Sequence, residues 1–281
     1  MRETRHTGGM PILNKDMTLC ISLAARPSNL GTRFHNYLYS ELGLNYIYKA
    51  FAPVDLANAI AGIRGLGIRG CAVSMPYKED VIALIDKMDA SASAIDSVNT
   101  IVNDGGRLTA YNTDYSAVQR LLAEHAVPPR YSVILRGSGG MAKAVAAALH
   151  DAGFDRGTIV ARNESAGRVL AARYGYDWTP EVGALTADLI VNVTPVGMTG
   201  GAASADTSFP PETIAAARLV FDVVASPAET PLVRAARALG KPVITGTEVV
   251  ALQAEEQFFL YTGIRPTPDQ VRRASAFSRE P

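Results

Sequence analysis

Apolar positions in the first hundred residues alternate between the spacing of strands and the spacing of helices. Strands are predicted at 17–24, 45–52 and 70–75, and helices at 32–42, 55–66 and 78–88. Thr32 is suited to cap the first helix, and Gly43 to end it. Two further strands, 99–103 and 107–111, flank an Asp-Gly-Gly turn, which is typical of a hairpin. The pattern predicts an α/β unit closed by an antiparallel edge.

A second run of strands and helices begins near Tyr131. Strands are predicted at 131–136, 157–162, 188–193, 219–224 and 241–245, with helices between them, for example at 141–150 and 231–239. One long helix at 248–261 follows and ends at Gly263. Strands that alternate with helices at this spacing indicate a parallel, doubly wound sheet. The chain is therefore predicted to be an α/β protein of two domains.

Composition and charge limit the class of protein. The chain has 281 residues, of which 48% are hydrophobic, so it has enough apolar material for buried cores. Its 27 basic and 27 acidic side chains balance, whereas proteins that bind nucleic acid or anionic membranes usually carry a basic excess. No apolar run approaches the roughly 18 residues of a membrane helix, and the N-terminus does not resemble a signal peptide. We expect a cytoplasmic protein with no nucleic-acid or membrane partner.

The two cysteines, Cys20 and Cys71, both lie inside apolar runs. Buried, reduced thiols are therefore expected in place of a disulfide framework. No set of zinc ligands is visible in the sequence, and no metal cofactor is predicted.

A glycine-rich turn lies between the predicted strand 131–136 and the helix after it. The turn is formed by Gly137, Ser138, Gly139, Gly140, Met141 and Ala142, in a G-x-G-x-x-A pattern. Gly137 permits a tight turn, Gly139 lets a pyrophosphate approach the backbone, and Ala142 allows the helix to pack closely on the strand. The helix N-terminus offers free N–H groups to the phosphates. Strand, turn and helix together predict dinucleotide binding, and a glycine turn without a ligand is the alternative.

The end of the next strand, at Arg162 and Asn163, bears on which dinucleotide is bound. An NAD site usually has Asp or Glu here, because a carboxylate accepts hydrogen bonds from the ribose hydroxyls. A guanidinium suits a 2′-phosphate, because it offers a planar set of charge-assisted donors. Arg168 could add a second charge, whereas Glu164 keeps NAD in consideration. NADP is the predicted cofactor and NAD the less favoured one, and a solvated Arg162 without a ligand is the alternative.

Lys78 and Asp114 are candidates for moving a proton. Hydride transfer at an alcohol or ketone needs a group that gives or takes the hydroxyl proton. Lys78 follows a predicted strand and Pro76, a position typical of a site at a strand end. Taken alone, Lys78 is better explained as an ordinary lysine at a helix start, and Asp114 as a helix cap. Sequence spacing does not bring the two residues together.

Several motifs occur in an order that resembles the shikimate dehydrogenases. They are Gly70 to Lys78 (G-C-A-V-S-M-P-Y-K), Ser97 to Thr100 (S-V-N-T), Tyr111 to Asp114 (Y-N-T-D), the glycine turn, Asn192 to Thr194 (N-V-T) and Leu252 to Ala254 (L-Q-A). The resemblance extends over about residues 17–265. It implies an N-terminal α/β substrate domain, formed by residues 1–113 and 246–281, and a Rossmann-type NADP-binding domain, formed by residues 114–245.

The resemblance also implies roles for the candidate residues. Lys78 would be the general acid/base on the substrate hydroxyl, and Asp114 would hydrogen-bond that hydroxyl and position Lys78. The implied substrate-binding residues are Ser74, Asn99, Gln253 and Asn29, and Asn192 and Thr194 join the glycine turn, Arg162 and Asn163 on the cofactor side. The implied reaction is reversible, NADP-dependent hydride transfer between shikimate, or a close analogue, and its 3-dehydro ketone.

Four positions depart from the pattern of the family. Asn29 and Gly31 stand where the family usually has two serines that hold the substrate carboxylate, and Ala72 stands where it has asparagine. Ala225 stands where a tyrosine is expected. These changes resemble a divergent, shikimate-dehydrogenase-like subgroup, whose members are expected to handle shikimate poorly or to prefer an analogue.

Other functions remain open from the sequence. The same chemistry could act on quinate, aminoshikimate or another cyclic hydroxy acid. A dinucleotide-binding regulator with vestigial catalysis, or a structural module that binds no dinucleotide, would also fit parts of the pattern. The expected partner is a small hydroxy acid, and a homodimer is left open.

Overall fold

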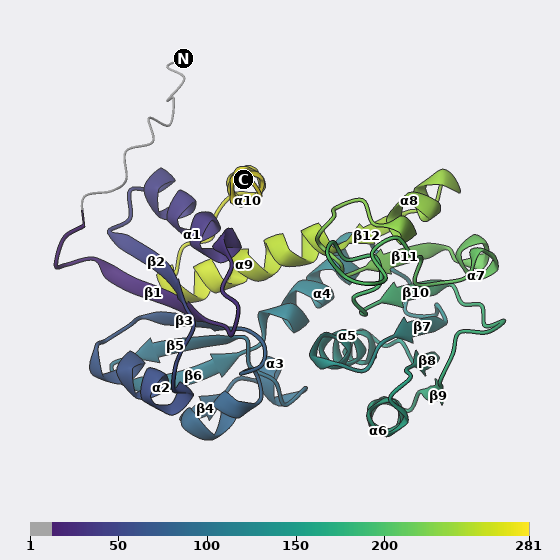
Figure 1. Ribbon diagram of the computed structural model, residues 1–281, viewed down its shortest axis with the longest axis horizontal. Helices are drawn as coiled ribbons and strands as arrows, with labels where there is room; N and C mark the ends of the chain where they lie inside the picture. The colour runs from purple at the N-terminus through teal and green to yellow at the C-terminus, as the bar shows by residue number, and fades with distance from the viewer. Residues whose placement is uncertain (1–12, 281) are drawn as a thin grey trace, which may run out of the picture.

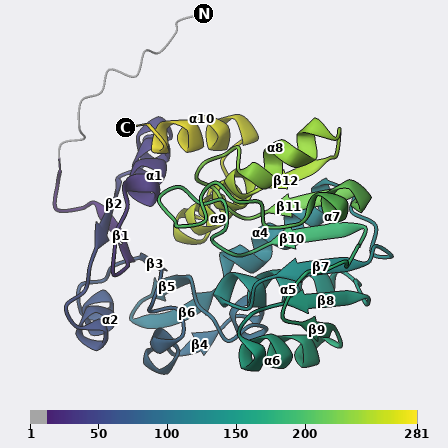
Figure 2. The same ribbon diagram turned by 45° about the vertical axis from the view of Figure 1, so that its right-hand side comes forward.

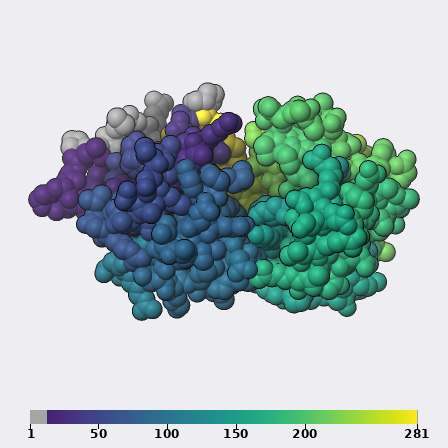
Figure 3. Space-filling view, turned by 60° about the horizontal axis from the view of Figure 1, so that its bottom comes forward, coloured from purple at the N-terminus to yellow at the C-terminus, as the bar shows by residue number. Residues whose placement is uncertain are grey.

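A computed structural model of the chain describes residues 13–280 and contains two six-stranded sheets with helices on both faces (Figure 1). The predicted α/β architecture is therefore confirmed. Viewed from another side, the first part of the chain (purple to blue) and its middle part (teal to green) form two adjoining masses (Figure 3).

The first sheet has the strand order β2-β1-β3-β5-β6-β4. Its strands are β1 (Thr18–Leu23), β2 (Tyr46–Phe51), β3 (Gly70–Val73), β4 (Lys87–Met88), β5 (Thr100–Asp104) and β6 (Arg107–Tyr111). β1 pairs in parallel with β2 and β3, whereas β5 runs antiparallel to β3 and β6. The predicted hairpin and its antiparallel edge are confirmed.

Helices cover both faces of this first sheet. They are α1 (Asn29–Glu41), α2 (Leu56–Gly65) and the short α3 (Ala90–Ser93), with a 3₁₀ helix at Asp80–Leu84. Alternate residues of β1 point to opposite faces, so Ile21 packs in the cluster that contains α2 and Cys20 packs in the cluster that contains α1. Cys20 and Cys71 are buried, free thiols.

Two local predictions in this part of the chain are wrong. Residues 78–88 do not form one helix, but a turn, the 3₁₀ helix and β4, which pairs with β6. Backbone N–H groups of Asp86 and Asp89 donate to carbonyls of Leu108 and Ala110, and this strand pairing overrides the helical spacing of the apolar residues. Thr32 is not a cap, because α1 starts earlier, after Ser28.

The second sheet is entirely parallel, with the order β12-β11-β10-β7-β8-β9. Its strands are β7 (Val133–Arg136), β8 (Gly157–Val160), β9 (Asp177–Thr179), β10 (Leu189–Asn192), β11 (Leu219–Asp222) and β12 (Val243–Thr245). The order reverses between β7 and β10, as in the Rossmann fold, and the doubly wound sheet is confirmed. β9 was not predicted, because it has only three residues and none of them is fully buried.

The second sheet is also covered on both faces. Its helices are α5 (Gly140–Asp151), α6 (Glu164–Tyr174), α7 (Pro211–Ala216) and α8 (Pro231–Ala238). Leu135 of β7 packs in the cluster that contains α5 and α6, whereas its neighbour Ile134 packs in the cluster that contains α7 and α8. Residues of β7 therefore alternate between two cores, and Arg136, at the end of this strand, lies on the face of Ile134.

Two helices connect the halves of the molecule, α4 (Thr113–Glu124) and α9 (Gly246–Thr262). Val249 and Leu252 of α9 pack in the core of the second sheet, whereas Phe258 and Tyr261 pack with α1 on the first. The last helix, α10 (Pro268–Ser278), lies against α1, so the C-terminus returns to the first sheet (Figure 2). Among residues 13–280, no helix is long and apolar enough to cross a membrane.

Candidate active site and dinucleotide cleft

Lys78 and Asp114 form an ion pair. Lys78 Nζ lies 2.7 Å from Asp114 Oδ2, and the two side chains are 24% and 10% exposed. Lys78 lies in the turn after β3, and Asp114 lies in the first turn of α4. Asn112 caps α4 instead, because its Oδ1 accepts from the backbone N–H of Tyr115 at 3.1 Å. The Asp114 carboxylate is therefore available to the lysine.

Hydrogen bonds from the segment 97–100 hold both members of this pair in place. The carbonyl of Lys78 accepts from the backbone N–H of Val98 at 2.8 Å. Asn99 Oδ1 accepts from the backbone N–H of Thr113, next to Asp114, at 2.8 Å. These bonds join the turn that carries Lys78 to the start of α4.

Asn99 is almost fully buried, and its amide is committed to internal bonds. Asn99 Oδ1 accepts from Thr113 N–H and Thr100 Oγ1, while Nδ2 donates to Thr113 Oγ1 at 3.1 Å. Gln257 contacts this network, because its Nε2 donates to Thr100 Oγ1 at 2.9 Å. Gln253, one turn earlier on α9, is half-buried, and its side chain forms no hydrogen bond within residues 13–280. The spacing of the two glutamines on one side of the helix was a signal for Gln257 that the sequence reasoning missed.

The remaining candidates for substrate binding, Ser74 and Asn29, are exposed. Ser74 directly follows β3, and Asn29 is the first residue of α1. Beside Asn29, a Cβ atom at Gly31 would lie 3.5 Å from the hydroxyl oxygen of the buried Tyr48. A small side chain at position 31 would therefore meet a phenol at ordinary contact distance.

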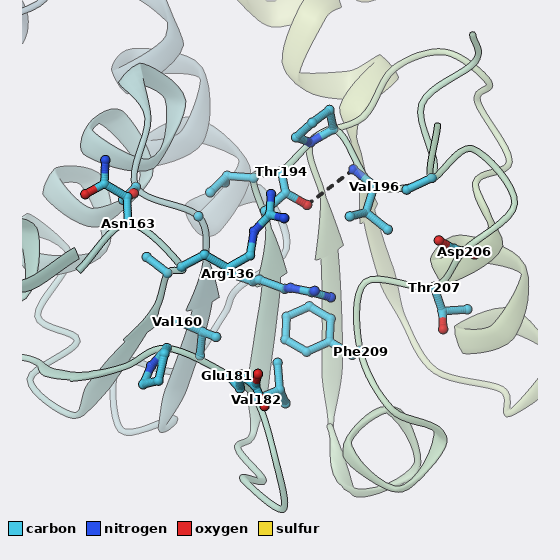
Figure 4. A pocket seen from close by; sticks show the side chains of 18 of the residues that line it. Arg136, Val160, Asn163, Glu181, Val182, Thr194, Val196, Asp206, Thr207 and Phe209 are labelled. Carbon is cyan, nitrogen blue, oxygen red and sulfur yellow. Dashed lines mark hydrogen bonds between the residues drawn. The ribbon is translucent and has the colours of Figure 1, made fainter. Parts of the chain in front are cut away.

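A cleft of about 1290 Å³ lies at the carboxyl ends of the second sheet's strands (Figure 4). It is lined by residues from 136–139, 160–163, 180–183, 193–196 and 201–210. The first four segments follow β7, β8, β9 and β10. In doubly wound sheets, ligands bind outside the carboxyl ends of the strands where the strand order reverses, which is the position of this cleft.

The glycine turn has the shape of a phosphate cradle. Gly137 has a φ of +132°, and a Cβ atom there would lie 2.6 Å from Val193 Cγ2. At Gly139, a Cβ atom would have no neighbour within 4 Å, so the backbone faces open space. Gly137, Ser138 and Gly139 line the cleft, whereas Gly140, Met141 and the buried Ala142 belong to the first turn of α5.

Arg162 and Asn163 both line the cleft, but Arg168 does not. Asn163 also caps α6, because its Oδ1 accepts from the backbone N–H of Ala166 at 3.1 Å. Arg168 Nε donates to Glu164 Oε1 at 2.8 Å, and its guanidinium lies 4.3 Å from the ring centre of Trp178. The predicted second charge is therefore not supplied by Arg168.

Asn192 supports the cleft without lining it, whereas Thr194 is one of its lining residues. Asn192 Oδ1 accepts from Thr194 Oγ1 at 2.6 Å, and Nδ2 donates to Asp222 Oδ1 at 3.0 Å. Asp222 is fully buried, and burial raises the pKa of its carboxyl group. The three side chains fix the loops that follow β10 and β11.

An ion pair joins the segment of Lys78 to the helix behind the glycine turn. Lys143 Nζ of α5 lies 2.6 Å from Glu79 Oε1, and Glu79 is the residue after Lys78. The turn that carries the Lys78–Asp114 pair is thus in contact with the element that starts at the dinucleotide cleft.

Comparison with known proteins agrees with this geometry. The family model of the shikimate dehydrogenase substrate binding domain matches residues 28–101. A shikimate dehydrogenase-like protein of Haemophilus influenzae is 53% identical over 95% of this chain and 99% of its own length. The NADP(+) shikimate dehydrogenase of Dehalococcoides mccartyi strain CBDB1 is 34% identical over 81% of this chain and 84% of its own. The chain belongs to the shikimate dehydrogenase family.

Solved structures of this family superimpose on the whole fold. A shikimate 5-dehydrogenase-like protein matches with a TM-score of 0.93 at 53% identity, covering 96% of this chain and 100% of its own. Thermus thermophilus shikimate 5-dehydrogenase, solved with NADP(H) and shikimate, matches with a TM-score of 0.83 at 29% identity. The match covers 93% of this chain and 100% of that one. Corynebacterium glutamicum quinate dehydrogenase, solved with NAD, matches with a TM-score of 0.84 at 28% identity. The match covers 93% of this chain and 98% of that one. The predicted membership of the shikimate dehydrogenase family is confirmed.

Sequence reasoning missed a basic residue of the cleft, Arg136. It lines the cleft at the end of β7, and its side chain is partly buried. The signal was a basic residue directly before Gly137, where a buried strand would otherwise end in an apolar residue.

Proposed function

We propose that this member of the shikimate dehydrogenase family is an NADP-dependent oxidoreductase. It interconverts a secondary alcohol of shikimate, or of a close analogue, with the 3-dehydro ketone. The observation that carries this proposal is the Lys78–Asp114 pair at 2.7 Å, held beside the helix that starts at the glycine turn. Solved relatives with NADP(H) and shikimate, or with NAD, support the same class of reaction.

The cleft suits NADP in shape and charge. The open backbone at Gly139 and the start of α5 would hold the pyrophosphate, and the guanidinium of Arg162 would hold the 2′-phosphate. When bound, NADP supplies or accepts the hydride.

Lys78 donates and accepts the proton of the reaction. In the direction of reduction, the Lys78 ammonium donates a proton to the oxygen of the ketone, and in oxidation the neutral amine takes the hydroxyl proton. Asp114 fixes the position of Lys78 Nζ and, through its second oxygen, can accept a hydrogen bond from the substrate hydroxyl. The frame built by Asn99 and Thr113 keeps this geometry from relaxing.

The chain lacks the two serines with which the family holds the substrate carboxylate. Asn29 and Gly31 occupy those positions, and the loss of a polar partner costs a ligand about 10- to 100-fold in affinity. Shikimate is therefore a weak substrate, and quinate, aminoshikimate or another cyclic hydroxy acid is the second candidate. The quinate dehydrogenase with a TM-score of 0.84 favours widening the test to quinate.

The test is NADP reduction by the whole protein with shikimate, quinate and aminoshikimate at several pH values. Turnover of one of these acids with NADP supports the proposal, and turnover with NAD alone contradicts the cofactor assignment. Tight NADPH binding without any turnover would indicate a dinucleotide-binding regulator. A failure to bind NADPH, measured by its fluorescence, would leave only a structural module.

The division of labour between the two halves is part of the same proposal. Residues 1–113 and 246–281 form the substrate-binding and catalytic domain, and residues 114–245 form the NADP-binding domain. The continuous packing of α9 across both cores supports a substrate domain that is discontinuous in sequence. A cytoplasmic location and a homodimer stay predictions.

A further inference from the structure

Two arginines of the dinucleotide cleft form no ion pair with any described residue of the chain. Arg136 ends β7, Arg162 follows β8, and both line the cleft. Among residues 13–280, no carboxylate oxygen lies within 4 Å of either guanidinium, although Glu181 and Asp206 also line the cleft. Most other arginines of the described chain form ion pairs, so two unpaired ones in a single cleft call for a physical explanation.

The strand geometry directs Arg136 into the cleft. Successive residues of a strand point to opposite faces, so Arg136 lies on the face of Ile134 and not on that of Leu135. One guanidinium nitrogen donates to the carbonyl of Ser208, in the loop that forms the opposite wall. A guanidinium has five N–H donors, and that of Arg136 forms no other hydrogen bond within residues 13–280.

The two positive charges affect each other. Arg136 and Arg162 line the same cleft, and burial lowers the pKa of Arg136, with the charge of Arg162 lowering it further. Arginine stays protonated at neutral pH, and it cannot escape this repulsion by losing its proton. An anion with two or more oxygens bound at this place would remove the repulsion and use the free donors.

The adenosine side of the cleft is where such an anion is expected. The pyrophosphate belongs at the glycine turn and the start of α5, whereas the end of the second strand is next to the ribose in this type of fold. Arg168, the other basic residue near that strand end, is bound to Glu164 and Trp178.

We propose that Arg136 and Arg162 together bind the 2′-phosphate of the dinucleotide, with Arg136 as the second, strand-borne arm of the site. This inference rests on the proposed NADP dependence. Arg136 also ties the phosphate to the loop of Ser208, so phosphate binding and the position of that loop are linked through one side chain.

The test measures binding to the whole protein of two adenosine fragments, adenosine 2′,5′-bisphosphate and adenosine 5′-monophosphate, by calorimetry. Arg136→Met should weaken the bisphosphate by about 10- to 100-fold, as expected for lost charge-assisted hydrogen bonds, and the monophosphate by less than about 3-fold. Arg136→Lys, which keeps the charge but not the planar donors, should fall between the wild type and Arg136→Met. Arg168→Met is the matched control and should leave the ratio of the two affinities unchanged.

The outcomes separate this inference from the proposed function. If the wild type binds both fragments equally, NADP dependence itself is wrong. If the wild type prefers the bisphosphate and Arg136→Met keeps that preference, only the role of Arg136 is wrong. Equal losses of both fragments in Arg136→Met and Arg136→Lys, with an unchanged melting temperature, would assign Arg136 to the adenosine or to the Ser208 loop, and would also overturn the inference.

Discussion

Lys78 Nζ and Asp114 Oδ2 lie 2.7 Å apart although 36 residues separate them in the chain. The first follows a strand of the sheet and the second begins a connecting helix, and the segment 97–100 bonds to both. In this partly buried ion pair each residue is the charged partner of the other. The arrangement holds Lys78 in a position from which it can exchange a proton with a ligand.

Lys78→Met should lower kcat on the best substrate by about 100- to 10,000-fold, because a general acid/base contributes that much. The binding of NADPH should not change. Lys87→Met, at an exposed lysine of β4, is the control and should keep full kcat. An unchanged kcat in Lys78→Met would refute the catalytic assignment.

The double variant Lys78→Met/Asp114→Asn should lose much less kcat than the product of the two single losses. Asp114 acts chiefly through the position of Lys78, so only its hydrogen bond to the substrate hydroxyl is left to lose once the lysine is gone. Steady-state kinetics of both single variants and the double variant test this, and multiplicative losses would give Asp114 an independent role.

Two glycine substitutions in the same turn should have different consequences. Gly137→Ala places a Cβ atom 2.6 Å from Val193 Cγ2 at a φ of +132°, and should destabilise the fold by about 1–3 kcal/mol. Gly139→Ala meets no protein atom within 4 Å, so it should keep the stability and lose dinucleotide affinity. Thermal unfolding and NADPH titration of both variants separate the effects; a stable Gly139→Ala that binds NADPH normally would argue against phosphate contact there.

Asn29→Ser/Gly31→Ser should lower the KM for shikimate if the missing hydroxyls limit its binding. The substitution at position 31 is sterically acceptable, since its Cβ would contact Tyr48 at 3.5 Å. Two recovered hydrogen bonds are worth about 10-fold or more in affinity. Asn29→Ala/Gly31→Ala is the control without hydroxyls. Equal KM values in the two double variants would mean that another group holds the carboxylate.

His35 should make the protein less stable in acid. It is fully buried between aromatic rings, with Tyr48 stacked at 4.5 Å, and burial lowers its pKa from 6.5 to about 3. Below pH 6.5 His35 is protonated in the unfolded chain but stays neutral in the folded protein. The free energy of unfolding therefore falls by up to about 1.4 kcal/mol per pH unit between pH 6.5 and 3. This contribution is fully present above pH 6.5.

His35→Leu should remove that part of the pH dependence. Denaturant unfolding at pH 7, 6, 5 and 4 measures it as a shallower fall of the free energy of unfolding with acid. His150→Leu, at an exposed histidine, is the control and should keep the slope of the wild type. The same slope in His35→Leu as in the wild type would mean that His35 takes up its proton within the fold.

Much of the fold follows from local patterns. All strands of the second sheet except β9, the hairpin at the end of the first sheet and the glycine turn were predicted, because their apolar spacing and turn residues act over a few neighbours. The prediction of a helix at 78–88 was wrong because the structure of this segment depends on distant residues. Its apolar residues can pack as a helix or as a strand, and bonds to Leu108 and Ala110, far along the chain, select the strand.

The residues of the site likewise fall into those that local sequence identifies and those that only the packing reveals. The glycine turn and Arg162 are contiguous with their strands, so sequence reasoning could identify them and predict where they lie. Arg136 and Gln257 were missed, because their importance depends on what faces them. Arg136 points into the cleft through the alternation of β7, and Gln257 reaches the network of Asn99 across two elements.

The sequence by itself determined that the chain forms two α/β units, the second with a dinucleotide turn, because hydrophobic periodicity and backbone preferences are local properties. Only the tertiary structure decided that Lys78 meets Asp114, that Arg136 lines the cleft while Arg168 packs on Trp178, and that α9 packs in both cores. These are contacts between distant segments, and their geometry depends on how sheets and helices pack, which no short stretch of sequence encodes.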